Sequence, residues 1–330
     1  MTAITRGKEL LYLSKADVVG LDIPRDTILD KVRQALVEHG NKRYEMPAKI
    51  GVHPYEDVFF HAMPAYLPEL NLVGAKWIEC YPRNPREFDL PQTTGLLCLN
   101  DVETGVPVAM MDCSWLTAVR TPAVTILMAE HLHPGATRFG MFGAGVQGRE
   151  HVLFAAHQLR GLEEIVVFDK FPEVAHKLVS DLQGQVEIPI RVGDSVEQVV
   201  KECEVLSSAT VVVREPQAIA KDEWVSKGQT IIPCDLNTFW DPAVSMRADA
   251  YITDSIEEHD LFADMGYYPG GSPTIVAETG EVLAGLKPGR TSADQLIVNS
   301  NIGMAVCDMA VASAIHEAAL AAGVGVTLEL

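Results

Sequence analysis

The sequence is poor in positive charge. Its 330 residues include 26 Lys and Arg against 45 Asp and Glu, which gives a formal net charge of −19 at pH 7. No run of five or more Lys or Arg residues occurs. A polyanion is repelled by nucleic acid and acidic membranes unless a basic patch is locally concentrated. The composition therefore argues against both kinds of partner, although an anionic cofactor can still bind at a helix N-terminus.

Paired cysteines and long apolar runs are also missing. The six cysteines are scattered, with no C-x-x-C pair and no His cluster at metal-ligand spacing, so reduced thiols and no metal site are expected. The first residues are too polar for a secretory signal, and no apolar run approaches the roughly 18 residues of a membrane span. A cytoplasmic location is the resulting expectation.

What is present suits a soluble globular protein of two domains, with 48% hydrophobic and 22% charged residues. The first part begins with a short strand, 10–14, and helix starts at Ser14 and Asp26. It continues with strand-like runs separated by Pro, Gly and Asn, at 46–51, 58–63, 72–79, 95–99 and 107–112. Asp101–Gly105 fits a hairpin turn. This pattern predicts an α+β domain with a largely antiparallel sheet.

From residue 137 to about 300, short apolar strands alternate with helices, which predicts a doubly wound α/β domain. The candidate strands are 139–141, 165–168, 188–192, 205–207, 230–233 and 250–253. An amphipathic helix, 115–131, leads into this region. An Ala-rich helix, 302–323, follows it and either packs back on the first domain or contributes a dimer contact. The predicted domains are 1–120 with 303–330, and 121–302.

A glycine cluster is the strongest motif. Gly143, Gly145 and Gly148 have G-x-G-x-x-G spacing between an apolar strand and a helix that starts at Val146, as in dinucleotide-binding folds. Asp169 ends the next strand, 21 residues beyond Gly148, where the fold places the acid that binds the adenosine ribose. A carboxylate there favours NAD(H) over NADP(H), although Lys170 adjoins it. The alternative is a glycine turn in an α/β layer without a ligand.

Three cations lie in apolar segments. Lys49, Lys76 and Arg120 each have mostly apolar neighbours in the sequence, and a buried cation needs an anionic partner or a ligand. Each one alone fits a salt bridge or an exposed side chain. Together they suggest a pocket for a substrate carboxylate, in which Arg offers two parallel hydrogen bonds.

Asp235 is the matching acid. It follows the apolar run 229–234, at the C-terminal end of a predicted parallel strand, where ligands bind in this fold. A carboxylate beside an imine is suited to acid/base work or to orienting an amine, whereas helix capping is the structural alternative. Ser208, Ala209 and Thr210 form a polar turn at another strand end, suited to line the cofactor or to serve as an ordinary loop.

Together these residues resemble the ornithine cyclodeaminase/mu-crystallin family over nearly the whole chain. The resemblance rests on Met46–Lys49, Gly74–Lys76, Leu116–Thr121, Gly143–Gly148, Asp235, Gly280–Arg290 and Asn301–Asp308. It implies a homodimer, with a substrate-binding and dimerisation domain made from the N-terminal part and the final helix, and a Rossmann domain between them.

Site roles follow from the resemblance. Lys49, Lys76 and Arg120 would hold the substrate carboxylate, with Thr93 and His61 in the same pocket, and Asp235 and Lys76 would be the catalytic groups. The expected dinucleotide contacts are Thr121, Gly143, Gly145, Val146, Gln147, Gly148, Asp169, Lys170, Ser208, Ala209, Thr210, Asp235 and Asn301.

Two departures concern the substrate. Ornithine-cyclising members carry Glu two residues before a Met-Pro pair, where this chain has His61, and the segment Asn299–Asn301 replaces a common Lys-Ser pair. The first hypothesis is therefore an NAD(H)-dependent amino-acid dehydrogenase or imino-acid reductase. The alternatives are a cyclodeaminase with catalytic NAD and a non-catalytic, crystallin-like NAD(P)H-binding protein.

Overall fold

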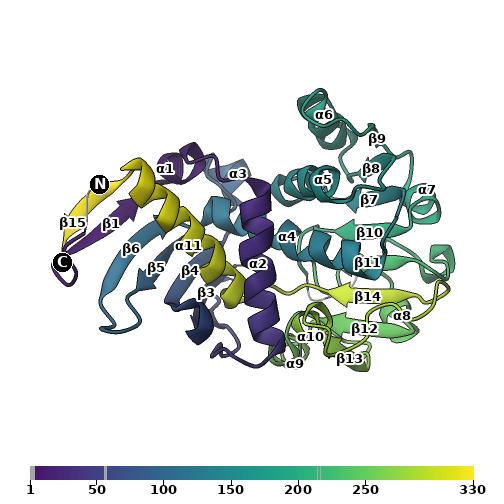
Figure 1. The fold of residues 1–330 in the computed structure, drawn as a ribbon. Helices are drawn as coiled ribbons and strands as arrows, with labels where there is room; N and C mark the ends of the chain where they lie inside the picture. Colours follow the sequence, from purple (N-terminus) through teal and green to yellow (C-terminus); the bar gives the residue numbers. More distant parts are fainter. Residues whose placement is uncertain (1–3, 56–57, 214, 216) are drawn as a thin grey trace. The chain divides into compact units, whose positions relative to one another are not determined.

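The computed structural model describes residues 4–55, 58–213, 215 and 217–330, and it contains two compact units (Figure 1). Unit 1 comprises the residues up to Arg120 together with Met304–Leu330, and unit 2 comprises Thr121–Gly303. The division falls within helix α4 (Ser114–Leu132).

Unit 1 is built on a seven-stranded sheet in the order β15-β1-β6-β5-β4-β3-β2. Its strands are β1 (Glu9–Leu13), β2 (Ile50–Val52), β3 (Phe59–Leu67), β4 (Leu72–Cys80), β5 (Thr93–Asn100), β6 (Pro107–Asp112) and β15 (Val326–Glu329). Among the described strands of this sheet, only β1 and β6 pair in parallel, so the expected α+β domain with a largely antiparallel sheet is confirmed. The predicted hairpin turn joins β5 to β6, with Gly105 at a φ of 76°.

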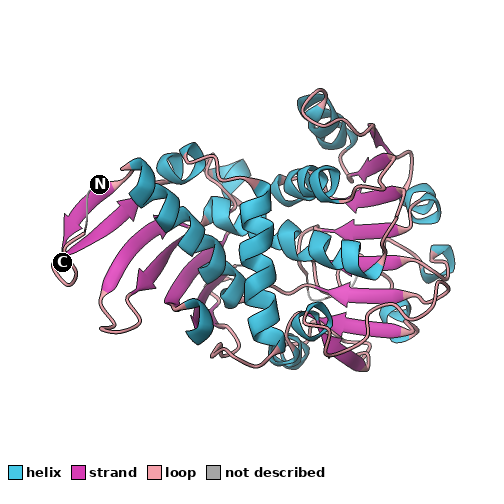
Figure 2. Ribbon diagram, viewed as in Figure 1, coloured by secondary structure: helices cyan, strands magenta, loops and turns pink. Residues whose placement is uncertain are grey.

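The helices of unit 1 include α1 (Lys15–Gly20), α2 (Arg25–Gly40), α3 (Asn84–Glu87), α11 (Ala305–Ala322) and the short 3₁₀ turn η1 (Pro68–Leu70). Ser14 caps α1 and exchanges hydrogen bonds with Asp17, as the sequence predicts. Helix α11 lies over one face of the sheet and packs against α2 on its other side (Figure 1 and Figure 2). Helix α11 comes so close to β4 that a Cβ atom on Gly74 would lie 2.9 Å from Met309 Sδ.

Helix α11 corrects the expectation about apolar runs. By length and composition it is apolar enough to cross a membrane, with a mean hydropathy of 1.4 over 18 residues. In the structure, 67% of that helix is buried. A core helix of a soluble protein has the same composition, because a helix enclosed on all sides is apolar all round.

Unit 2 is an eight-stranded parallel sheet in the order β13-β12-β14-β11-β10-β7-β8-β9, which confirms the Rossmann-type fold. Its strands are β7 (Arg138–Phe142), β8 (Glu164–Phe168), β9 (Ile190–Val192), β10 (Val205–Ser208), β11 (Thr230–Pro233), β12 (Ala250–Thr253), β13 (Ile275–Glu278) and β14 (Ile297–Ser300). The chain runs outward from β7 to β9 and then continues at β10, on the other side of β7. Ligands bind at the carboxyl ends of the strands at such a switch point.

The connecting elements of unit 2 are mostly helical. They are α5 (Val146–Gln158), α6 (Pro172–Leu182), α7 (Val196–Glu202), η2 (Asp222–Trp224), α8 (Pro242–Met246), α9 (Ile256–Asp264) and α10 (Thr279–Leu283).

Several predicted elements differ from the structure. The run 46–51 becomes a strand only at Ile50, because Pro47 lacks the N–H that a ladder needs. Strands β13, β14 and β15 were not predicted, and β15 is exposed at every position, so it carries no apolar alternation. The sequence predicts an amphipathic helix over 115–131, but the second half of α4 is buried on nearly every side.

Candidate functional site

The glycine loop of unit 2 follows β7. Gly143 has a φ of 95°, and a Cβ atom there would lie 2.6 Å from the carbonyl oxygen of Ala209. A Cβ atom on Gly148 would lie 1.9 Å from the carbonyl oxygen of Gly143. A Cβ atom on Gly145 would meet nothing within 4 Å. The fold itself therefore requires glycine at 143 and 148, whereas the open space at Gly145 suits the close approach of a ligand.

Helix α5 begins directly after this loop. Gly145 is its N-cap and supplies no side-chain hydrogen bond, so the N–H groups of the first turn have no cap from that residue. Val146 and Gln147 are the first two helical residues, and the Val146 side chain is 69% exposed. This helix end has the geometry of an anion site and fits a dinucleotide pyrophosphate.

Asp169 lies at the carboxyl end of β8 and supports the loop. Its Oδ2 accepts a hydrogen bond from the Ala144 N–H at 2.7 Å, and its Oδ1 accepts one from the Phe171 N–H at 2.9 Å. Each carboxylate oxygen has a second lone pair, which leaves acceptor capacity for ribose hydroxyls. Lys170 is exposed, and its Nζ lies 5.9 Å from the centre of the Phe171 ring.

Asp235 is fully buried just beyond β11. Its Oδ1 accepts a hydrogen bond from Ser208 Oγ at 2.7 Å, and its Oδ2 accepts from the Thr210 N–H at 3.0 Å and from Thr210 Oγ1 at 2.6 Å. Burial raises the pKa of the Asp235 carboxyl even though all three donors lower it. The capping interpretation is wrong, because the next helix, α8, has Asp241 as its N-cap.

Other expected cofactor residues lie in the same unit. Ala209 continues the β10 turn, and its N–H donates to the carbonyl oxygen of Phe142 at 2.9 Å. Asn301 follows β14 and is 4% exposed, with its Nδ2 donating to Thr125 Oγ1 at 3.2 Å. Thr121 is the first residue of unit 2 on helix α4.

In unit 1, the predicted cations meet an acid that sequence reasoning missed. Lys76 Nζ lies 2.6 Å from Asp308 Oδ2, and Arg120 Nε lies 3.0 Å from Asp308 Oδ1. All three side chains are at least nine-tenths buried. Asp308 belongs to helix α11. The sequence feature that indicates its role is an acidic residue within an apolar, Ala-rich helix. The salt-bridge alternative therefore holds for Lys76 and Arg120.

Lys49, His61 and Thr93 complete this region of unit 1. In the ladder, His61 pairs with Ile78, Met63 with Lys76, and Thr93 with Cys80, so His61, Lys76 and Thr93 project from the same face of the sheet. Burial, together with the charges of Lys49, His53 and Lys76, lowers the pKa of His61 to about 3. We call Lys49, His61, Lys76, Arg120 and Asp308 the cationic cluster.

Two cations of the cationic cluster, Lys76 and Arg120, share one carboxylate, that of Asp308. The imidazole of His61 is neutral at pH 7 because its pKa is lowered to about 3. Burial lowers the pKa of Lys76 to about 8, although Asp308 raises it. Two cations that share one carboxylate are suited to bind a second carboxylate from a ligand.

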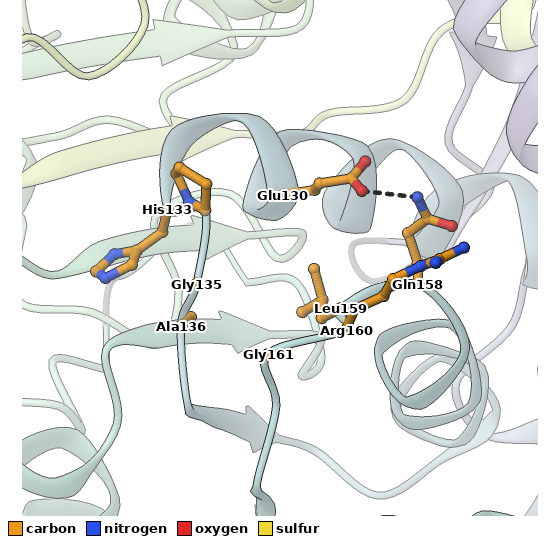
Figure 3. A pocket seen from close by; sticks show the side chains of 9 residues that line it. Glu130, His133, Gly135, Ala136, Gln158, Leu159, Arg160 and Gly161 are labelled. Carbon is orange, nitrogen blue, oxygen red and sulfur yellow. Dashed lines mark hydrogen bonds between the residues drawn. The ribbon is translucent and has the colours of Figure 1, made fainter.

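Unit 2 also contains a pocket of about 200 Å³ (Figure 3). Its lining includes Glu130, His133 and Ala136, and Gln158 donates to Glu130 across it at 2.8 Å. Ala136 precedes β7, so this pocket lies at the opposite end of that strand from the glycine loop. Among the described residues, no group of three or more His, Cys, Asp and Glu side chains could hold a metal ion.

Two curated proteins are similar over almost their full length. The chain is 31% identical over 321 residues to the nodulation efficiency protein NfeD of Rhizobium meliloti, covering 95% of this chain and 97% of that protein. It is 31% identical over 326 residues to alanine dehydrogenase of Archaeoglobus fulgidus, covering 96% and 97%.

Solved structures agree with this likeness. An archaeal alanine dehydrogenase dimer with bound NAD matches with a TM-score of 0.86 and 28% identity, over 97% of this chain and 99% of that chain. Δ(1)-pyrroline-2-carboxylate reductase of Thermococcus litoralis, in complex with NADH and L-proline, matches with a TM-score of 0.85 and 26% identity, over 96% and 99%. The family model described as ornithine cyclodeaminase/mu-crystallin matches residues 11–323. The chain therefore belongs to the ornithine cyclodeaminase/mu-crystallin family.

Proposed function

We propose that the chain is an NAD(H)-dependent oxidoreductase that interconverts an L-amino acid, or an N-substituted or cyclic amino acid, with its imine. The observation that carries this proposal is Asp235, a fully buried acid with a raised pKa. It lies just beyond β11, at the carboxyl ends of the parallel strands of unit 2, where ligands bind in this kind of sheet. A group in that place is suited to exchange a proton with a substrate nitrogen.

Unit 2 supplies the cofactor half of the proposal. The first turn of α5 would hold the pyrophosphate, Asp169 the ribose hydroxyls, and the turn 208–210 the nicotinamide end. A carboxylate at 169 repels a 2′-phosphate, and this favours NAD(H) over NADP(H). When bound, the nicotinamide supplies a place where a hydride is taken up or given. The relatives solved with NAD and NADH support this assignment.

Unit 1 supplies the substrate half. The cationic cluster would hold the substrate carboxylate, with Arg120 as its most directional donor. The guanidinium donates to Asp308 through Nε at 3.0 Å. Its two Nη atoms carry N–H groups in the planar arrangement that matches the two oxygens of a carboxylate.

His61 bears on the class of substrate. With its pKa lowered to about 3, the imidazole is neutral at pH 7 and lies among cations. A neutral imidazole does not offer the negative charge that the distal ammonium of a diamino acid needs. We therefore place amino acids with neutral or anionic side chains ahead of diamino acids, and dehydrogenase or reductase chemistry ahead of ornithine cyclisation.

Two other functions remain as alternatives. A cyclodeaminase would use the same Asp235 and the same cofactor, but the hydride would return and ammonia would leave. A non-catalytic NAD(P)H-binding protein would bind the cofactor without turnover, and the buried Asp235 and the cationic cluster count against it. Both belong to the range of functions that the family resemblance implies.

We also propose a homodimer formed through the face of the unit 1 sheet that carries Trp77 and Leu96. These side chains are 46% and 42% exposed and stand opposite each other in the ladder, with Phe60 stacked on Trp77 at 5.7 Å. An exposed apolar sheet face of this kind is typical of an interface. The alanine dehydrogenase relative is a dimer, which favours a second copy as the partner. A Leu96→Glu variant that remained dimeric by light scattering would exclude this face.

A paired assay tests the proposed activity. NADH absorbance and ammonia are followed together while the purified protein meets L-alanine, L-ornithine, cyclic imines, and 2-oxo acids with ammonia or methylamine. A net NADH change that depends on substrate is the expected result. Ammonia release from ornithine without net NADH change would establish the cyclodeaminase instead, and tight NADH binding with no turnover would establish the carrier.

A further inference from the structure

Four polar side chains next to the cofactor elements of unit 2 form a connected network, and of the four only Asn301 is an expected cofactor contact. They are Thr125 on α4, His151 on α5, Cys234 after β11 and Asn301 after β14. Thr125, His151 and Asn301 are buried, and Cys234 is partly buried. Because Cys234 directly precedes Asp235, the network reaches the segment that carries the proposed acid.

The hydrogen bonds of His151 have a definite direction. Its Nδ1 lies 2.8 Å from the carbonyl oxygen of Gln147, in the first turn of α5. A carbonyl oxygen only accepts, so Nδ1 carries the proton, and Nε2 of the neutral ring is an acceptor. Burial lowers the pKa of His151 to about 4, which keeps the ring neutral at pH 7.

Thr125 connects this imidazole to the other two residues. Its Oγ1 lies 3.1 Å from His151 Nε2, 3.2 Å from Asn301 Nδ2 and 3.3 Å from Cys234 Sγ. Cys234 Sγ also lies 3.6 Å from His151 Nε2. In the arrangement that satisfies the three contacts of Thr125, Asn301 and the Cys234 thiol donate to the Thr125 oxygen, and the Thr125 hydroxyl donates to His151, which donates to Gln147.

We propose that Thr125 and His151 are positioning residues that hold Asp235 in place relative to the phosphate-binding end of α5. The hydrogen bonds to the Asp235 carboxylate come from Ser208 and Thr210, so they tie it to the β10 turn and not to α5. The network supplies that second tie through the adjacent Cys234. Its effect on turnover rests on the proposed function, whereas the hydrogen-bond directions do not.

The kinetic test removes the shared oxygen. Thr125→Val keeps the shape of the side chain and deletes the hydroxyl, and Thr125→Ser is the matched control that retains it. A small displacement of a reacting group is costly, so we expect kcat to fall about tenfold in Thr125→Val, with the Kd for NADH within about twofold of wild type. Thr125→Ser should retain most of the wild-type kcat.

A double variant separates a shared network from two independent effects. Because linked residues are not additive, Thr125→Val combined with His151→Gln should lower kcat no further than the stronger single change. A wild-type kcat in Thr125→Val would overturn the proposal. So would single effects that multiply in the double variant.

A second readout needs neither substrate nor cofactor. In the ¹⁵N-histidine-labelled protein, NMR reports which ring nitrogen of His151 is protonated, and the signal is assigned by its loss in His151→Gln. We expect Nδ1–H at pH 7 and no titration down to about pH 5, in keeping with the neutral tautomer. An Nε2–H tautomer, or a titration near the ordinary value for histidine, would overturn the network even if the protein proved to have another activity.

Discussion

The two units each enclose a carboxylate, and the two sites differ in every respect except burial. Asp308 in unit 1 and Asp235 in unit 2 are both 0% exposed. Asp308 faces the cations Lys76 and Arg120, whereas Asp235 accepts hydrogen bonds from two hydroxyls and one backbone N–H. A buried charge needs a partner of opposite sign or enough donors. The same residue type is therefore suited to hold cations in one unit and to exchange a proton in the other.

The largest effect on stability is expected from the ion-paired acid. Asp308→Asn leaves Lys76 and Arg120 without their carboxylate, so the free energy of unfolding should fall by about 3–5 kcal/mol. Asp235→Asn is the matched change in unit 2 and should cost only about 1–2 kcal/mol, because the donors to Asp235 are uncharged and no buried cation is left without a partner. Urea denaturation of both variants measures the difference. Equal losses would break the comparison between the two carboxylates.

A smaller effect is expected in the pH dependence of substrate binding. Burial lowers the pKa of Lys76 to about 8, so the ammonium loses its proton as the pH rises above that value. The KM for the amino acid should then rise by up to about tenfold per pH unit, because Lys76, the proposed partner of the substrate carboxylate, loses its positive charge. Lys76→Arg keeps the positive charge at high pH and should remove this rise in KM. The same rise in Lys76→Arg, or a flat KM between about pH 7 and 10, would contradict the role of Lys76.

The smallest effect concerns His61 and the acid side of the stability curve. Its pKa is about 3 in the folded protein against 6.5 ordinarily, so below pH 6.5 only the unfolded chain takes up the proton. The stability contribution is complete well above pH 6.5 and is lost as the pH falls through that value, by about 1.3 kcal/mol between pH 7 and 5.5. The glutamine of His61→Gln does not titrate, so the free energy of unfolding of this variant should fall by that much less between pH 7 and 5.5. Urea curves with the same pH slope in both proteins would show that His61 is solvated.

The fold was largely predictable because its signals are local. The apolar strands of unit 2, the glycine loop and the hairpin at Asp101–Gly105 depend on short segments, and the structure contains each of them. Strand β15 was not predictable in this way, because all four of its residues are exposed and no apolar period marks it. It forms by pairing with β1, more than 300 residues away in the chain.

The sequence identifies which residues belong to the candidate site, but it does not identify which of them contact one another. Lys76 and Arg120 stand out as cations in apolar runs, but nothing local connects them to Asp308, which lies 188 residues beyond Arg120. The donors to Asp235 come from a turn 25 residues earlier, brought there by the pairing of β10 with β11. Such contacts depend on strand order and register, which a single sequence does not specify.

The most direct test of the central claim measures NADH binding and turnover in Asp235→Asn, with the substrate that the paired assay identifies. The account predicts a loss of at least about 100-fold in kcat, because the buried acid no longer exchanges a proton with the substrate nitrogen. The Kd for NADH, followed by fluorescence, should stay within about twofold of wild type, since the glycine loop and Asp169 are unchanged. Wild-type turnover in Asp235→Asn would remove this acid from the mechanism and contradict the account.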